Sequence, residues 1–465
     1  MSFWDAATSL PAAALVCLAV ALFVAFAFEF INGFHDTANA VTTVIYTRTM
    51  KPTPAVIYSG TMNCLGALLT VVVGSAAVAF SIVNLLPVDL LVEGNSNGAL
   101  VMVMSLLLAG VTWNLGTWAM GLPVSSSHTL IGSILGVGIA NGWWSGTGFG
   151  GVNWTKAGEV GLGLLISPIV GFACAAGLLL AMKKVAPDPR LYTPPGEGEA
   201  PPRWIRAVLV LTCGGVSFAH GSNDGQKGMG LVLLVLVGFL PVHYALDTNS
   251  PDEAKGVAAA VAGVREEFAR HAATMPAALD GDLAAISTAL AGKDSFEQLD
   301  SALNNRWAVR QAIFRSRRAL GAADLPADLR AAVDPHRKTF AGAIEFVPLW
   351  VVFGTALALG VGTCVGYKRV VVTVAEKIGN SHLNYAQGAA AQGVAAATIL
   401  LADIGHLPVS TTQVLSSGVG GTMVASGSGM QTATCRKILL AWVLTLPACM
   451  ILAGCLFILG RVAFG

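Results

Sequence analysis

The chain has 465 residues, of which 54% are hydrophobic and only 11% are charged, and its formal net charge is +1. A soluble domain carries about 25% charged residues, so this composition excludes an ordinary soluble protein. Of the 27 lysines and arginines, 12 lie between residues 242 and 341, together with 13 of the 26 acids. The remaining sequence is therefore almost free of charge, which predicts an all-α protein that crosses the lipid bilayer many times. The small net charge gives no reason to expect a nucleic-acid partner.

Long runs without Asp, Glu, Lys or Arg mark the predicted membrane spans. Each is long enough for at least one crossing of about 20 residues, and together they occupy 52–88, 94–155, 160–182, 346–367, 378–402 and 404–435. The first apolar stretch, 11–28, lacks the basic flank and the small-residue cleavage site of a signal peptide. We therefore expect it to be a retained membrane helix, and we predict about ten crossings in total.

Two motifs occur twice in the same order, which predicts that the chain contains two copies of one unit. Residues 28–40 align with 216–228, so that Gly33 pairs with Gly221 and Asp36 with Asp224. Further along, 122–128 (LPVSSSH) aligns with 407–413 (LPVSTTQ). A segment rich in Pro, Gly and charge separates the copies, as expected for a linker. The predicted domains are a first transmembrane repeat 1–184, a cytoplasmic linker 185–204, a second repeat 205–241 and 342–465, and a soluble helical insert 242–341 within that second repeat.

The basic clusters predict the orientation of the two copies. Lys and Arg are enriched in cytoplasmic loops, and here they flank the spans at 48–51, 183–184, 368–369 and 436–437. One topology with about ten crossings satisfies all four clusters, with both termini and the insert outside. The copies then have opposite orientations. Inverted repeats are typical of transporters, whose substrate site lies near the membrane midplane where the repeats meet.

The first repeated motif concentrates ionisable residues inside apolar segments. They are Glu29, His35 and Asp36 in the first copy, and His220, Asp224 and Lys227 in the second. Such residues are costly within a membrane and indicate function. The Gly and Asn residues around them predict that each helix breaks there and frees backbone groups to bind ions. The alternative is that these residues only pair with one another and hold the helices together.

The second repeated motif indicates anion binding. A proline is followed by three hydroxyl residues that open an apolar run, Ser125, Ser126 and Ser127 in one copy and Ser410, Thr411 and Thr412 in the other. Ser and Thr are preferred N-cap residues, and the N-terminus of a helix offers free N–H groups and a positive dipole end. Two such ends at a pseudo-twofold axis would hold an oxyanion. The alternative is that the hydroxyls only cap two ordinary helices.

The carboxylates Asp36 and Asp224 would repel an anion unless something offsets their charge. A bound cation, protonation of a carboxyl, or a substrate that donates hydrogen bonds would each do so. Phosphate still carries protons near neutral pH, whereas sulfate has none to donate, so phosphate is the better substrate. His35 next to Asp36 is either a proton relay or a structural histidine.

Both repeated motifs resemble the duplicated signatures of the PiT family of inorganic phosphate transporters. The resemblance covers essentially all the membrane-spanning chain, and is strongest to the bacterial low-affinity Pit-type branch. It implies a symporter of the bacterial inner membrane, a homodimer, with inverted repeats and re-entrant or half-helix hairpins. It also implies a set of residues that line the phosphate site: Asp36, Asn39, Ser125, Ser126, Ser127, Asp224, Ser410, Thr411 and Thr412. The positions implied for cation or proton coupling are Asn32, His35, Asp36, Asn223, Asp224 and Lys227.

The resemblance further implies proton coupling, with phosphate carried as a neutral complex with a divalent metal such as Mg²⁺. Two departures from the commonest family pattern put sodium coupling in doubt: His35 stands where many members have Asn, and Lys227 aligns with Asn39 of the first copy. We expect Lys227 to supply a fixed positive charge in place of a bound cation. A sodium-coupled phosphate symporter, a sulfate permease of the same architecture and a channel are the alternatives. An enzyme is not expected because the sequence contains no HExxH or GxSxG arrangement, and no cofactor is expected.

Overall fold

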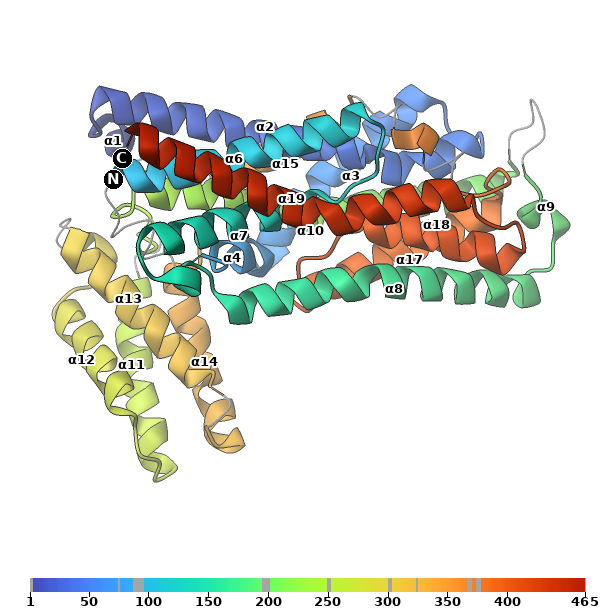
Figure 1. The fold of residues 1–465 in the computed structure, drawn as a ribbon. Coiled ribbons are helices and arrows are strands. Elements are labelled where there is room, and N and C mark those ends of the chain that lie inside the picture. Colours follow the sequence, from blue (N-terminus) through green and yellow to red (C-terminus); the bar gives the residue numbers. More distant parts are fainter. Residues whose placement is uncertain are drawn as a thin grey trace. The chain divides into compact units, whose positions relative to one another are not determined.

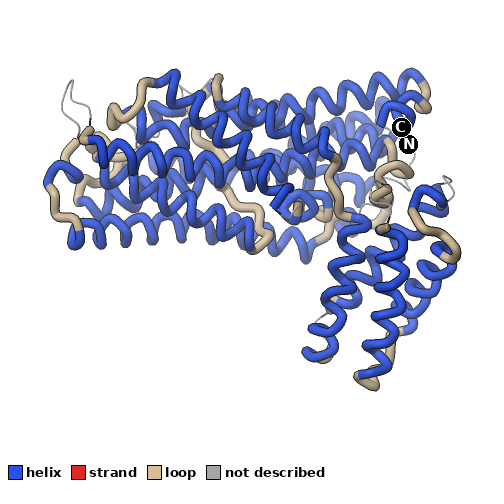
Figure 2. The backbone as a smooth tube through the Cα atoms, turned by 180° about the vertical axis from the view of Figure 1, so that it is seen from behind, coloured by secondary structure: helices blue, strands red, loops and turns tan. Residues whose placement is uncertain are grey.

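The computed structural model describes residues 3–73, 76–86, 96–194, 201–248, 252–299, 303–322, 325–365, 370–373 and 378–464. The chain divides into two compact units, one made of Met1–Val16 and Leu236–Val347 and the other of Cys17–Val235 and Pro348–Gly465. Helices joined by loops make up both units (Figures 1 and 2), which confirms the all-α prediction for the described residues. The predicted basic cluster 368–369 and residues 195–200 of the predicted linker lie outside the described residues.

The larger unit contains the apolar helices. In chain order they are α2 (Ala12–Tyr46), α3 (Pro52–Val73), α4 (Ala77–Val83), α6 (Ser96–Ala119), α7 (Ser126–Trp144), α8 (Trp154–Val185), α9 (Pro189–Tyr192), α10 (Arg203–Phe239), α15 (Leu349–Thr363), α17 (Tyr385–Ile404), α18 (Thr411–Ser426) and α19 (Thr432–Phe464). Within the described residues, five of them are long and apolar enough to cross a membrane: α2, α6, α8, α10 and α19. Helices α3, α7, α15, α17 and α18 have 15 to 22 residues each.

The helix break expected within the first repeated motif is absent. Helix α2 runs without interruption through 28–40, and α10 runs through 216–228. The motif glycines instead allow close packing of helices. A Cβ atom at Gly33 would strike backbone atoms of α15, and one at Gly221 would strike the backbone of α3 at Asn63. Small residues let membrane helices approach in this way, so the prediction of broken helices was wrong for this motif.

The second repeated motif marks the start of a helix in both copies. Residues 122–125 are non-helical and α7 begins at Ser126, while 407–410 are non-helical and α18 begins at Thr411. Ser125 and Ser410 are the N-cap residues, and each side chain accepts a hydrogen bond from the backbone N–H three residues later, at 3.2 Å in both copies. The sequence preference for Ser at this position therefore has a direct local cause.

Each of these two shorter helices packs against a long helix of the other copy. Helix α7 packs along α19, and α18 packs along α8 (Figure 1). Glycines allow the close approach: a Cβ atom at Gly136 would strike the backbone of Met450, and one at Gly171 would lie 2.5 Å from the carbonyl oxygen of Val414. The two predicted copies therefore interlock.

The smaller unit contains α1 (Phe3–Thr8) and four amphipathic helices, α11 (Glu253–Arg270), α12 (Ala277–Leu290), α13 (Leu303–Leu320) and α14 (Ala327–Ile344). Each of the four contacts the next, and α11 also contacts α14, which closes a four-helix bundle. Val261, Val264 and Phe268 of α11 are buried in it. Arg310 of α13 is also buried and donates hydrogen bonds to the carbonyl oxygens of Ala245 and Ile344, at 2.9 and 3.1 Å.

Candidate functional site

The acidic residues of the two copies meet through a histidine. His220 of α10 places its Nε2 atom 3.3 Å from Asp36 Oδ2 on α2 and 3.2 Å from Asp224 Oδ2 on its own helix. Its Nδ1 atom lies 3.0 Å from Asn63 Oδ1, and the Asn63 amide donates to Thr363 at 2.8 Å. Both ring nitrogens therefore face oxygen acceptors, an arrangement that fits an imidazolium with a proton on each nitrogen.

A buried lysine completes the charge balance. The ammonium group of Lys227 contacts Asp224 Oδ1 at 2.6 Å. It also donates to Ser127 Oγ at 2.7 Å and to the carbonyl oxygen of Val409 at 2.6 Å. Two carboxylates are thus accompanied by two cationic side chains in a fully buried cluster, which explains how they lie close together in a medium of low dielectric constant.

The starts of α7 and α18 meet at this cluster. Ser127 in the first turn of α7 donates a 3.1 Å hydrogen bond to the carbonyl oxygen of Val409, two residues before α18 begins. On the α18 side, Thr412 donates to Asp36 Oδ1 at 2.5 Å and Thr411 donates to Asp36 Oδ2 at 3.4 Å. The first amides of a helix have no partner within that helix. Two helix N-termini therefore lie beside a cluster of charged side chains.

The three consecutive hydroxyls of the first copy have different environments. Ser125 caps α7. The Ser127 hydroxyl accepts a hydrogen bond from Lys227 and donates one to the carbonyl oxygen of Val409. The Ser126 hydroxyl is buried and has no hydrogen-bond partner among the described residues. Buried hydroxyl groups without a hydrogen-bond partner are rare in native proteins. A ligand bound at the N-terminus of α7 would supply that partner.

The remaining predicted residues occupy three kinds of position. Asn223 is used structurally: its amide donates to Asp403 and to the carbonyl oxygen of Leu407, the latter at 3.3 Å. Asn32 Oδ1 and both ring nitrogens of His35 are buried without a hydrogen-bond partner in the described part of the chain, although His35 Nδ1 lies 3.7 Å from Asp36 Oδ1. The side chain of Asn39 lies outside the described residues.

Three residues at the site are not predicted from the sequence: His220, Asn63 and Asp403. His220 stands out in the sequence only as an ionisable residue within an apolar segment. In the structure, Asp403 binds both Ser222 and Asn223. The signal for Asp403 was present, because it is the single charged residue between the charge-free runs 378–402 and 404–435. Asn63 shares the charge-free run 52–88 with a second amide, Asn84, so the run alone does not single it out.

Asp36, His220 and Asp224 each offer a ligand atom, and these atoms lie within 4.8 Å of one another, a spacing that also admits a cation.

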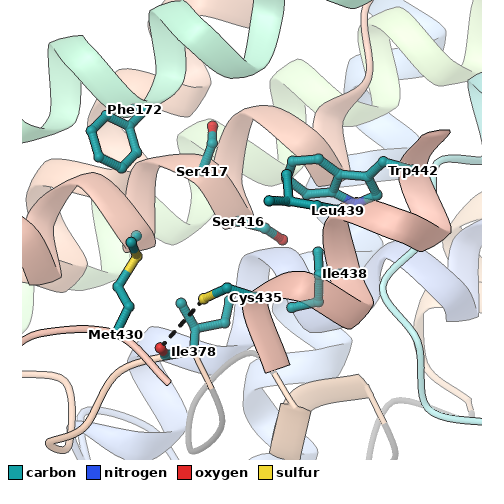
Figure 3. Close-up of a pocket in the computed structure, with 10 residues that line it drawn as sticks. Phe172, Ile378, Ser416, Ser417, Met430, Cys435, Ile438, Leu439 and Trp442 are labelled. Carbon is teal, nitrogen blue, oxygen red and sulfur yellow. Dashed lines mark hydrogen bonds between the residues drawn. The ribbon is translucent and has the colours of Figure 1, made fainter. Parts of the chain in front are cut away.

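A separate cavity lies among α8, α18 and α19 (Figure 3). Its lining includes Phe172, Ile438, Leu439 and Trp442 and contains no charged side chain. It is therefore unsuited to an anion and is distinct from the charged cluster.

Comparison with known proteins identifies the family. Residues 32–453 match the family model described as the phosphate transporter family. The chain belongs to the phosphate transporter family. It is 40% identical to the low-affinity inorganic phosphate transporters PitA and PitB of Escherichia coli K12, with 95% of each chain covered in both cases. A probable low-affinity inorganic phosphate transporter of Bacillus subtilis is 28% identical, with 91% of each chain covered.

The fold is also found in a solved structure, that of "The sodium-dependent phosphate transporter". It matches with a TM-score of 0.60 at 18% identity, covering 96% of this chain and 99% of that one. The predicted resemblance to the PiT family is thus confirmed, as is the prediction that the chain is not an enzyme. The chain is a multi-pass membrane protein homologous to the bacterial Pit transporters.

Proposed function

We propose that the chain is a low-affinity symporter that imports inorganic phosphate across the bacterial inner membrane, coupled to protons, as a neutral complex with a divalent cation such as Mg²⁺. The proposed cation is part of the cargo. The relatives at 40% identity are named as low-affinity phosphate transporters and align over 95% of the chain. The observation that carries the proposal is the junction of Ser127, Lys227 and Val409, where two helix N-termini converge on a buried charged cluster.

Phosphate would bind at the N-termini of α7 and α18. The first-turn amides and the unpartnered Ser126 hydroxyl supply donors for its oxygens, in the manner of other helix N-terminal anion sites. Asp36 and Asp224 would accept hydrogen bonds from the phosphate protons, which sulfate does not offer. The proposed site comprises Asp36, Asn39, Ser125, Ser126, Ser127, Asp224, Ser410, Thr411 and Thr412, with Ser125 and Ser410 acting through the helix ends that they cap.

Proton coupling is favoured by the cationic side chains within the cluster. His220 and Lys227 accompany the two carboxylates with positive charge, so the site does not need sodium for that purpose. The proposed coupling positions are Asn32, His35, Asp36, Asn223, Asp224 and Lys227. Asn223 would act indirectly, because its Oδ1 atom accepts from the N–H of Val409, at 3.4 Å, and its amide is bound by Asp403.

We further infer inverted repeats, about ten crossings and a homodimer. The same order of three helices occurs twice. A long helix carries the first motif, a shorter helix begins at the second motif, and a long helix with an internal proline follows. These helices are α2, α7 and α8 with Pro168, and then α10, α18 and α19 with Pro447. Transporters built from inverted repeats place their substrate between the copies. Cross-linking in native membranes would test the dimer.

The function is tested by uptake of labelled phosphate into proteoliposomes. A proton gradient with Mg²⁺ is compared with a sodium gradient, for the unmodified protein, for Asp36→Asn and for Asp188→Asn as a control. Asp188 lies in an exposed loop and pairs with Arg190. We expect uptake to follow protons and Mg²⁺, to be lost in Asp36→Asn and to persist in Asp188→Asn. Uptake that follows sodium would overturn the coupling, and transport of sulfate without phosphate would overturn the substrate. A channel would show no counterflow.

A further inference from the structure

A third buried carboxyl group, that of Glu29, lies near the pair formed by Asp36 and Asp224. Glu29 lies on α2, seven residues or two helical turns before Asp36, so both side chains lie on the same side of that helix. It is 0% exposed, and neither carboxylate oxygen has a hydrogen-bond partner among the described residues. An ionised carboxylate that is buried without a partner is very costly, so Glu29 is suited to this position in its protonated form.

The surroundings of Glu29 are built to accept it. A Cβ atom at Gly228 of α10 would strike the Glu29 side chain, with 2.5 Å to Oε1 and less to the carbon atoms. A side chain at position 228 would therefore require the Glu29 carboxyl group to move. Gly228 follows Lys227 directly and lies one helical turn after Asp224. The glutamate therefore lies against the stretch of α10 that carries the site.

Glu29 has no acidic counterpart in the second copy. In the alignment of 28–40 with 216–228 its equivalent is Ser217, whose hydroxyl lies 2.8 Å from Ser59 Oγ and donates to the carbonyl oxygen of Cys213. The first copy thus has an additional carboxyl group, and the second has an additional cation in Lys227. A purely structural element of the repeat would be expected in both copies.

The groups that face Glu29 come from two helices. On α10 they are His220, Asp224 and Lys227, and on α2 it is Asn32, one turn along. Helices α6 and α15 pack against α2 beside Phe28 and Phe30, and neither contains an Asp, Glu, His, Lys or Arg residue. The charge state of Glu29 therefore depends on the same groups that surround the proposed phosphate site.

We propose that Glu29 is the residue that binds and releases the transported proton. The proposal rests on the proposed function, because it assigns a residue to proton coupling in phosphate symport. The proton occupies the Glu29 carboxyl group in the conformation described here. When the site opens to the cytoplasm, the O–H bond breaks, the proton passes to water, and the electron pair stays on the carboxylate. Lys227 and His220 then stabilise that negative charge until a proton from outside restores the neutral form.

Replacing Glu29 with glutamine tests the proposal because it preserves shape and removes titration. Reconstituted full-length protein is assayed in two modes with labelled phosphate: net uptake driven by a proton gradient with Mg²⁺, and exchange against internal phosphate without a gradient. Exchange requires no proton release. We expect Glu29→Gln to lower net uptake at least about tenfold, to abolish the pH change reported by an internal dye, and to keep exchange near the unmodified rate.

Two further variants make the outcome decisive. Glu159→Gln on α8 is the matched control, since Glu159 is exposed and pairs with Lys156, and it should behave as the unmodified protein in both modes. Glu29→Asp keeps a titratable carboxyl group and should keep net uptake, with a changed pH profile. Unchanged proton-driven uptake in Glu29→Gln would overturn the proposal. It would also be overturned if both variants, Glu29→Gln and Glu29→Asp, lost net uptake and exchange to the same extent. If the unmodified protein shows no proton-driven phosphate uptake, the proposed function itself fails.

Discussion

The ammonium group of Lys227 donates a 2.7 Å hydrogen bond to the hydroxyl group of Ser127, although the two residues lie 100 positions apart. The same group contacts Asp224 and the carbonyl oxygen of Val409, each at 2.6 Å. One side chain thereby joins α10 to the starts of α7 and α18. Any movement that opens the space between these helix ends must break or replace at least one of the three contacts.

Removing the charge of Lys227 should therefore impair transport and stability together. In Lys227→Gln the buried Asp224 carboxylate keeps its contact with His220 but loses the ammonium group, and removing one partner of a buried ion pair costs about 3–5 kcal/mol. We expect proteoliposome uptake of phosphate to fall at least about tenfold, with a lower midpoint of thermal unfolding. Lys156→Gln is the matched control, because Lys156 and Glu159 form a pair of the same i,i+3 spacing at the surface, where ion pairs contribute about 0–1 kcal/mol. Normal uptake by Lys227→Gln would show that its charge is dispensable.

The hydroxyl group of Thr412 should matter more than its size. It donates to Asp36 at 2.5 Å, and a hydrogen bond to a charged group contributes about 1.5–3 kcal/mol. Thr412→Val should lower phosphate uptake by about 10- to 100-fold, while Thr412→Ser should retain most of it. Thr422→Val on the same helix is the control, since the Thr422 hydroxyl donates to the carbonyl oxygen of Val419. Equal activity of the valine and serine variants at 412 would contradict the role of this bond.

Asp403 should support the site indirectly. Its carboxylate accepts from Ser222 and Asn223, and Asn223 in turn accepts from the N–H of Val409 just before α18. Asp403→Ala leaves the two donors without that acceptor, at a cost of about 1–3 kcal/mol. We expect the thermal unfolding midpoint in detergent to fall by roughly 2–10 °C, with Asp188→Ala in the exposed loop unchanged. A midpoint equal to that of the unmodified protein would exclude this supporting role.

Arg310 should hold the four-helix bundle of the smaller unit together. It is buried, donates to the carbonyl oxygens of Ala245 and Ile344, and lies 5.5 Å from the centre of the Trp307 ring. Arg310→Met leaves two carbonyl groups without this donor, at a cost of about 1–3 kcal/mol. Proteolytic cleavage within 242–341 should therefore become faster by about 5- to 150-fold. Arg265→Met is the control, because Arg265 pairs with Asp280 at the surface. Equal cleavage rates in the two variants would disprove the role.

The amino-acid sequence by itself determined the class of the protein and the identity of its main polar residues. Membrane insertion depends on the local density of apolar side chains, and helix starts depend on adjacent residues such as Ser125 and Ser410. Both are local properties, so the apolar helices, the helix starts of α7 and α18 and the presence of Asp36 and Asp224 within apolar segments could be read without a structure. The duplication of both motifs added the order of the two copies.

Only the tertiary structure decided how these residues meet. His220 contacts Asp36 although the two residues lie 184 positions apart, and Thr412 donates a hydrogen bond to Asp36 from 376 positions away. No local sequence pattern specifies such pairs. The motif glycines show the same limit: from sequence Gly33 and Gly221 predicted helix breaks, but each is pressed against the backbone of another helix. A glycine that breaks a helix and one that admits a neighbouring helix look alike in sequence, because the difference lies in what packs against it.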